Sequence, residues 1–137
     1  MKPIVLCAGL LLVVVSALSQ NAPSWPCSDD LTKTEGDNHR IRVNVNVTQG
    51  MVQKKILPDA SELKGTKTKS TVVLRVLIGK DGFVRCADPV QGEPTLFERT
   101  VVAAKQWRFQ PYLLNGQPII VETTMEFQFN KNKVTAQ

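Results

Sequence analysis

The chain has 137 residues, 42% of them hydrophobic, and its 17 Lys and Arg against 12 Asp and Glu give a formal net charge of +5. This length excludes more than one domain. A chain of this size can bury about two-thirds of its unfolded surface, so it needs neither a metal nor a dense set of disulfides to fold.

The first residues have the pattern of a secretory signal peptide. Lys2 provides a positive charge, residues 4–15 form an apolar run, and Ala17 and Ser19 have the spacing of a signal-peptidase site. The apolar run is shorter than the about 20 residues that a membrane span needs. We expect residues 1–19 to be removed by cleavage after Ser19, and retention as an uncleaved anchor is the alternative.

Residues 20–39 lack apolar periodicity and contain many Pro, Ser, Asp and Asn residues, which predicts an exposed N-terminal arm. The arm carries Cys27, and Cys86 lies in the body of the chain. Such a pair in an exported protein suggests a disulfide, although two unrelated thiols are the alternative. A Cys27–Cys86 bridge would tie the arm to the core and is nominally worth ~4 kcal/mol.

Polar and apolar residues alternate over residues 40–48, which predicts a half-buried strand. Residues 51–57 predict a second extended segment. A single helical turn is expected at residues 59–64, and the Lys- and Thr-rich residues that follow, up to residue 70, predict a mobile loop.

Residues 71–78 predict the clearest strand of the chain. The GKDG stretch at residues 79–82 predicts a hairpin, because Asp-Gly accepts the positive φ angles of tight turns. Residues 83–87 are expected to return as the partner strand and residues 88–92 to form a connection. The core side of the first strand is predicted to consist of Val72, Leu74, Val76 and Ile78.

Thr95 and Glu98 have the spacing of a capping box, which predicts the start of a helix. The helix must end before Pro111, because proline disfavours helical geometry at the preceding residue. We interpret Trp107 and Phe109 as core residues at the helix end, rather than as a binding site for a flat ligand. The apolar face of the helix is predicted to consist of Phe97, Val101, Ala104 and Trp107.

A long final strand is predicted at residues 119–129, after a turn at Asn115 and Gly116. One face of this strand is expected to point into the core, and it consists of Ile119, Val121, Thr123, Met125, Phe127 and Phe129.

Two stretches together identify a family. They are TVVLRVLIGKDGFVR at residues 71–85 and AAKQWRFQPYLLNGQPIIVETTMEFQF at residues 103–129. This combination resembles the C-terminal domain of TonB-type energy transducers, over residues 49–130. The resemblance implies an α+β fold, with a small antiparallel sheet of about three core strands, a helix packed on one face, and an additional N-terminal strand. The domain is placed at residues 40–131, and residues 132–137 are expected to be a tail.

The resemblance also implies a function in the periplasm. Domains of this family contact outer-membrane receptors in transmembrane transport, and a short receptor segment adds as a strand beside the final strand of the domain. The residues that occupy this partner-binding position are Glu122, Thr123, Thr124, Met125, Glu126, Phe127 and Gln128.

The sequence departs from the family pattern in two respects, which leaves an alternative function open. The usual Pro-x-Tyr-Pro motif is missing, since Pro58 is followed by Asp-Ala-Ser. A Pro-rich stalk, which a complete transducer uses to cross the periplasm, is also missing. The alternative is an exported domain without energy coupling that binds envelope polyanions through lysines. Those lysines are Lys64, Lys67 and Lys69, with Lys54 and Lys55 nearby, and a merely solvated surface is the simpler interpretation.

Other chemistry finds no support in the residue pattern. His39 is the single His, and neither a Cys-x-x-Cys nor a Gly-rich phosphate loop occurs. No Ser has a plausible arrangement of His and acid around it. We therefore expect no enzyme activity, no metal, no cofactor and no nucleic-acid partner, and the oligomeric state stays open.

Overall fold

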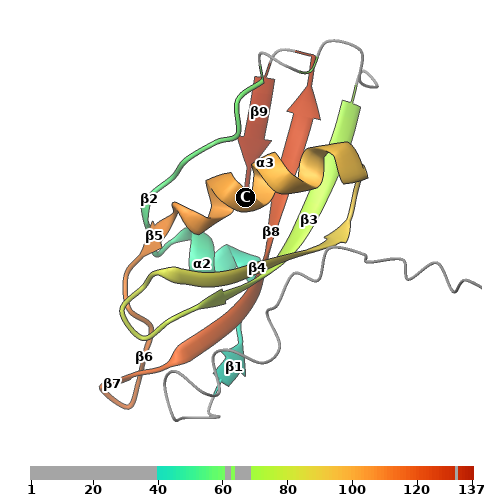
Figure 1. The fold of residues 1–137 in the computed structure, drawn as a ribbon. Helices are drawn as coiled ribbons and strands as arrows, with labels where there is room; N and C mark the ends of the chain where they lie inside the picture. The colour runs from blue at the N-terminus through green and yellow to red at the C-terminus, as the bar shows by residue number, and fades with distance from the viewer. Residues whose placement is uncertain (1–39, 61–62, 64–68, 132) are drawn as a thin grey trace, which may run out of the picture.

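The structure is a computed structural model, and it describes residues 40–60, 63, 69–131 and 133–137. The predicted signal peptide and arm lie outside these residues, as does most of the predicted helical turn and loop before Lys69. Figure 1 shows the elements, which are β1 (Arg40–Arg42), α2 (Val45–Gln49), β2 (Val52–Lys54), β3 (Lys69–Ile78), β4 (Val84–Gln91), the 3-10 turn η1 (Pro94–Leu96), α3 (Phe97–Lys105), β5 (Arg108–Phe109), β6 (Leu113–Leu114), β7 (Gln117–Pro118), β8 (Ile120–Asn130) and β9 (Lys133–Ala136).

A mixed sheet forms the body of the described part of the molecule. The strand order is β1-β8-β3-β4, and β9 also pairs with β8. Strands β3 and β8 run antiparallel in continuous register, from Lys69 opposite Asn130 to Ile78 opposite Val121. The expected α+β class is confirmed. The sequence predicted about three core strands, and the described part of the chain contributes five strands to this sheet.

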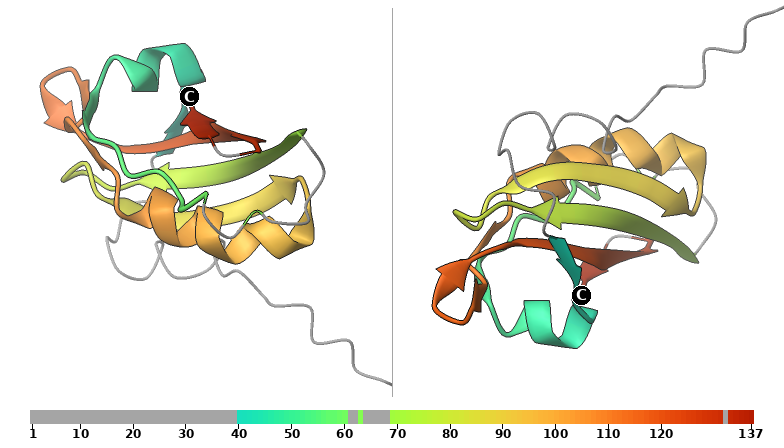
Figure 2. Two further views of the ribbon diagram at one scale, coloured as in Figure 1. Left: turned by 90° about the horizontal axis from the view of Figure 1, so that it is seen from above. Right: turned by 90° about the horizontal axis from the view of Figure 1, so that it is seen from below.

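The main core lies between the sheet and α3, which crosses the face of β3 and β8 in Figure 1. Figure 2 shows α3 along one side of the strands and α2 on the opposite side, near the C-terminus. Phe97, predicted to face the core, is only half-buried, and it packs against the core from the start of α3. The other side chains predicted from the alternating patterns are buried, namely Val72, Leu74, Val76, Val101, Trp107 and Phe109.

The hairpin between β3 and β4 follows the prediction at its turn but not in its length. Gly82 has a φ of 81° and donates its N–H to the carbonyl oxygen of Gly79 at 2.9 Å. Residues 88–92 were expected to be a connection, and this is wrong, because β4 continues to Gln91. The register shifts between Val73 and Leu74, next to Pro89, and this irregularity accommodates a proline in an edge strand.

The strand predicted at residues 40–48 is wrong beyond Arg42. The chain forms β1 and then turns into α2, whose N-cap is Asn44. The side chain of Asn44 accepts a hydrogen bond from the N–H of Asn46 at 2.9 Å, which stabilises a helix start where the apolar alternation predicted a strand. The short helix buries Thr48 against the sheet.

The predicted capping box at Thr95 and Glu98 is also wrong. The helix is preceded by η1, and the Thr95 hydroxyl donates to a Glu93 carboxylate oxygen at 3.0 Å instead of capping α3. Pro94 occupies the first position of η1, where the absence of an N–H costs nothing.

The final residues are a strand where a tail was expected. Strand β9 pairs antiparallel with β8, from Lys133 opposite Asn130 to Ala136 opposite Phe127. Val134 is buried in the main core, which gives the strand an apolar anchor.

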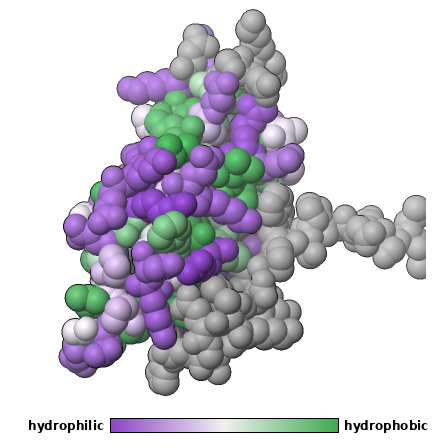
Figure 3. Space-filling view, turned by 60° about the vertical axis from the view of Figure 1, so that its left-hand side comes forward, coloured by the Kyte–Doolittle hydropathy of each residue, from purple (hydrophilic) through white to green (hydrophobic). Residues whose placement is uncertain are grey.

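In the face shown in Figure 3, apolar side chains gather in small patches between hydrophilic ones. None of the helices in the described ranges is long and apolar enough to cross a membrane.

Candidate partner-binding edge

The outer edge of β8, the edge away from β3, is occupied at both ends. At one end β1 runs parallel to β8, with Arg40 opposite Ile120 and Arg42 opposite Glu122, and Val43 donates its N–H to the carbonyl of Glu122 at 2.9 Å. At the other end β9 pairs with residues 127–130. The free edge that the sequence predicted is therefore interrupted.

Thr124 lies in the gap between these two occupied ends. Two residues later, Glu126 exchanges both backbone hydrogen bonds with Gln137, at 2.7 and 2.9 Å. Because the backbone groups of a strand alternate between its two edges, Thr124 also directs its N–H and C=O to the outer edge. Within the described part of the chain, neither group has a backbone partner there. Thr123 belongs to the other set, because it is one residue away from Thr124 and its N–H and C=O therefore point toward β3, where Val76 lies opposite it.

Five of the seven residues predicted to bind a partner fall into three groups along the outer edge, and the other two, Thr123 and Met125, direct their backbone groups to β3. Glu122 pairs with β1, residues 126–128 pair with the C-terminal segment, and Thr124 has an open backbone. The side chains of Thr123, Met125 and Phe127 are buried and cannot touch a partner, whereas those of Thr124 and Gln128 are exposed.

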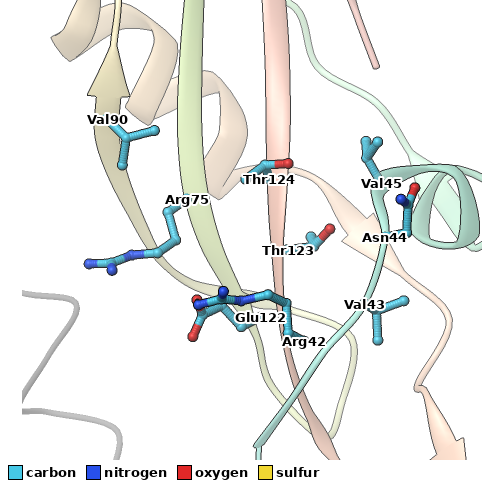
Figure 4. Close-up of a pocket in the computed structure, with 9 residues that line it drawn as sticks. All are labelled: Arg42, Val43, Asn44, Val45, Arg75, Val90, Glu122, Thr123 and Thr124. Atoms are coloured by element: carbon cyan, nitrogen blue, oxygen red, sulfur yellow. The ribbon is translucent and has the colours of Figure 1, made fainter.

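A hollow of about 520 Å³ adjoins Thr124, and Figure 4 shows the side chains around it. Residues 42–45 line one side, where the chain passes from β1 to α2, and Arg75 and Val90 line the other. Between them lie residues 122–124 of β8. The hollow combines valine side chains, which can accept an apolar side chain, with two arginines that are each paired with a carboxylate, Arg42 with Glu122 and Arg75 with Asp88. No local sequence pattern predicts that Val43, Val45 and Val90 meet at this hollow, because they lie on separate segments of the chain.

Two arginines of β1 form ion pairs with one carboxylate of β8. Arg42 donates to Glu122 at 2.8 Å, and Arg40 lies 3.9 Å from the other oxygen of the same carboxylate. The side chain of Arg42 is 81% exposed and that of Glu122 only 13%, so the arginine is the partner that can move into solvent. Exposed pairs of this kind contribute about 1 kcal/mol or less. These pairs orient β1 but bind it weakly.

The aromatic residues after α3 fulfil a structural role. The indole N–H of Trp107 donates to the carbonyl of Ile56 at 2.7 Å, and the indole ring packs 6.0 Å from the Phe109 ring and 5.9 Å from the Phe127 ring, measured between centroids. The ring is 2% exposed. A flat ligand could not reach it.

Two of the lysines proposed for polyanion binding, Lys64 and Lys67, lie outside the described residues. Lys55 is engaged within the protein, since its ammonium group donates to the carbonyl of Ala136 and lies 5.3 Å from the Trp107 ring centroid. Lys54 and Lys69 are exposed on different strands. The polyanion alternative stays a prediction. In the described ranges, no cluster of His, Cys, Asp and Glu could hold a metal ion.

Cys86 is disulfide-bonded in the structure. Its predicted partner, Cys27, lies outside the described residues. Cys86 itself lies on β4 and is 6% exposed.

The family comparison agrees with this architecture. The model described as "Gram-negative bacterial TonB protein C-terminal" matches residues 61–130, which is just over half of the chain, from the segment before β3 to the end of β8. The chain belongs to this family. Neither a curated protein nor a solved structure matches it.

Membership in the family defines the class of protein. The chain contains a TonB-like interaction domain of a non-catalytic family, which indicates a periplasmic place in envelope transport. Outer-membrane receptors are the general kind of partner for such domains.

Proposed function

We propose that the chain is an exported periplasmic module that binds an extended segment of an outer-membrane receptor by strand addition to β8. The observation that carries this proposal is the open backbone of Thr124 beside the hollow. An unpaired strand edge is a template for another chain, and main-chain hydrogen bonds then supply much of the affinity.

The receptor segment would pair with residues 120–124 of β8 and take the place of β1. Strand β1 has only three residues, and its two arginines are exposed. Strand β9 is the poorer candidate for displacement, because Val134 is buried in the core and Gln137 is doubly bonded to Glu126. The gap at Thr124 lets the segment make its first contact before β1 leaves.

The hollow indicates the side chains that such a segment should carry. Val43, Val45 and Val90 offer an apolar surface, which suits a β-branched or other aliphatic residue. The side chain of Arg75 is 48% exposed at the rim of the hollow, and it lies 3.1 Å from Asp88. An acidic residue in the segment would add a favourable interaction with Arg42 or Arg75.

Proline at position 124 tests strand addition. Thr124→Pro removes the outward N–H and places a ring at the paired edge, so the affinity for a synthetic receptor segment should fall at least about tenfold. The domain should still fold, because that N–H has no backbone partner in the described part of the chain and Thr123 is already extended. The measurement is fluorescence anisotropy with a labelled peptide from a periplasm-exposed receptor segment.

Two further variants control this experiment. Thr124→Ala keeps the N–H and should bind like the parent protein. Thr123→Pro removes a hydrogen bond to β3 opposite Val76, so this variant should lose stability itself. Equal peptide affinity of Thr124→Pro and the parent protein would contradict strand addition at this edge.

A further inference from the structure

Strand β1 covers part of the same edge of β8 that a receptor segment would use. The residues of β8 that direct backbone groups to this edge include Ile120, Glu122 and Thr124, because outward groups recur at every second residue. Strand β1 lies opposite Ile120 and Glu122, and the Glu122 carbonyl accepts a hydrogen bond from the N–H of Val43 at 2.9 Å. Of these three residues, only Thr124 has an open backbone within the described ranges.

The described contacts that hold β1 on β8 are largely exposed. The strand has only three residues. Its two arginines share one carboxylate, since Arg42 lies 2.8 Å and Arg40 3.9 Å from Glu122, and their side chains are 81% and 49% exposed. Figure 4 shows the Arg42 side chain directed to Glu122. Between the arginines, Ile41 packs against the main core but is only partly buried. Such a strand can leave β8 without opening the core.

Helix α2 keeps β1 close to β8 after such a release. The helix begins at Val45, two residues after the hydrogen-bonded Val43. Its Thr48 side chain is buried, and the Thr48 hydroxyl oxygen lies 3.5 Å from that of Thr123 on β8. A strand tethered in this way rebinds intramolecularly, at an effective concentration on the order of mM. A receptor segment must therefore compete against it.

We propose that β1 is an autoinhibitory strand, which lowers the affinity of the free protein for a receptor segment until it is displaced from β8. This regulation rests on the proposed function, because β1 and the receptor segment use the same backbone groups. Only the fraction of the protein in which β1 has left β8 is fully competent to bind, and the ion pairs to Glu122 reduce that fraction. Weaker β1 contacts therefore raise the receptor affinity, whereas loss of a direct contact to the receptor segment would lower it.

Proline at position 41 tests the inhibition. The N–H of Val43 points to β8, so the N–H of Ile41, two residues earlier, points the same way. Ile41→Pro removes this donor and should release β1, so the affinity for a labelled receptor peptide without charged side chains should rise at least about tenfold. Ile41→Val keeps the donor and loses one methyl group, so its affinity should stay within about threefold of the parent protein.

Fluorescence anisotropy measures these affinities, and hydrogen exchange followed by NMR shows the state of β1 without peptide. In free Ile41→Pro the Val43 amide should exchange faster than in the parent protein. The amide of Val76, which lies opposite Thr123 in the β3–β8 pair, should keep its protection and so confirm that the domain is folded.

Arg40→Gln/Arg42→Gln provides a second, milder release that leaves β8 unchanged. The variant removes both ion pairs to Glu122, and the affinity for the same uncharged peptide should rise at least about threefold. Arg85→Gln is the matched control, because it removes an exposed ion pair to Asp81 on the β3–β4 hairpin and should leave the affinity unchanged. If Ile41→Pro does not fold, the arginine variant decides.

The outcomes separate this regulation from the proposed function. If the β1 variants bind no more tightly than the parent protein, while Thr124→Pro still lowers the affinity, strand addition stands and autoinhibition is overturned. Weaker binding by the β1 variants would also overturn it, because β1 would then be part of the binding surface. If Thr124→Pro has no effect either, the peptide binds elsewhere and both proposals are wrong.

Discussion

Replacement of Trp107 by alanine is expected to lower the free energy of unfolding by roughly 3–5 kcal/mol. The indole ring is almost fully buried, contacts Phe109 and Phe127, and hydrogen-bonds the carbonyl of Ile56. Its removal leaves a cavity in the main core and an unpaired carbonyl at Ile56. A denaturant melt followed by circular dichroism measures the change.

Trp107→Phe separates the two contributions. Phenylalanine keeps an aromatic ring in the core but cannot donate to Ile56, so the loss should be smaller, at about 1–3 kcal/mol for the unpaired acceptor. A change below about 1 kcal/mol for Trp107→Ala, together with loss of peptide binding, would mean that the ring serves a partner and not the core.

Gly82→Ala is expected to cost about 2–5 kcal/mol of stability. Gly82 has a φ of 81°, which is unfavourable by about 1–2 kcal/mol for a residue with a Cβ. An added Cβ would also lie 1.9 Å from the carbonyl oxygen of Phe109, so the backbone of the hairpin or of β5 must shift, at a further cost of about 1–3 kcal/mol. That shift would weaken the hydrogen bond from the Phe109 N–H to the carbonyl of Gly82.

Gly116→Ala provides the matched control for this substitution. Gly116 has a similar φ of 78°, but no atom lies within 4 Å of an added Cβ. Only the backbone cost should remain, about 1–2 kcal/mol. Equal losses in the two variants, measured in the same denaturant melt, would contradict the close approach of the Gly82 turn to Phe109.

The elements that the sequence predicted well are those with a long local pattern. Strands β3 and β8 alternate over ten and eleven residues, and both recur in the structure with the expected core faces. The turns at Gly82 and at Asn115 and Gly116 also follow their residue types, because only a few residues tolerate a positive φ.

The errors arose where a local interaction overrode a pattern. The side chain of Asn44 caps the start of α2, so the residues that were predicted to form one strand form β1 and α2 instead. Pro89 suggested a connection after Ala87, yet β4 lies at a sheet edge and adapts its register to the proline. In β9 only Val134 is fully buried and Ala136 is partly buried against the core, and two such residues are too weak a signal for periodicity.

The candidate site could be predicted only in part for a related reason. The alternation placed residues 122–128 on one strand and identified their exposed row. It could not show that residues about 80 positions earlier pair with Glu122, or that the C-terminus pairs with Glu126, because such contacts depend on tertiary packing. That the backbone of Thr124 is open follows only from the positions of β1 on one side of it and of Gln137 on the other.

The most direct test of receptor binding at β8 is an NMR titration of the isotope-labelled protein with an unlabelled peptide from a periplasm-exposed segment of an outer-membrane receptor. Strand addition predicts that the amide signals of Thr124, Ile41 and Val43 change first, with faster hydrogen exchange in β1 as it leaves β8. Amides of β3 that pair with β8, such as Val76, should keep their protection. Signal changes confined to the lysine-bearing surface, with β1 and Thr124 unaffected at saturating peptide, would contradict the proposed function.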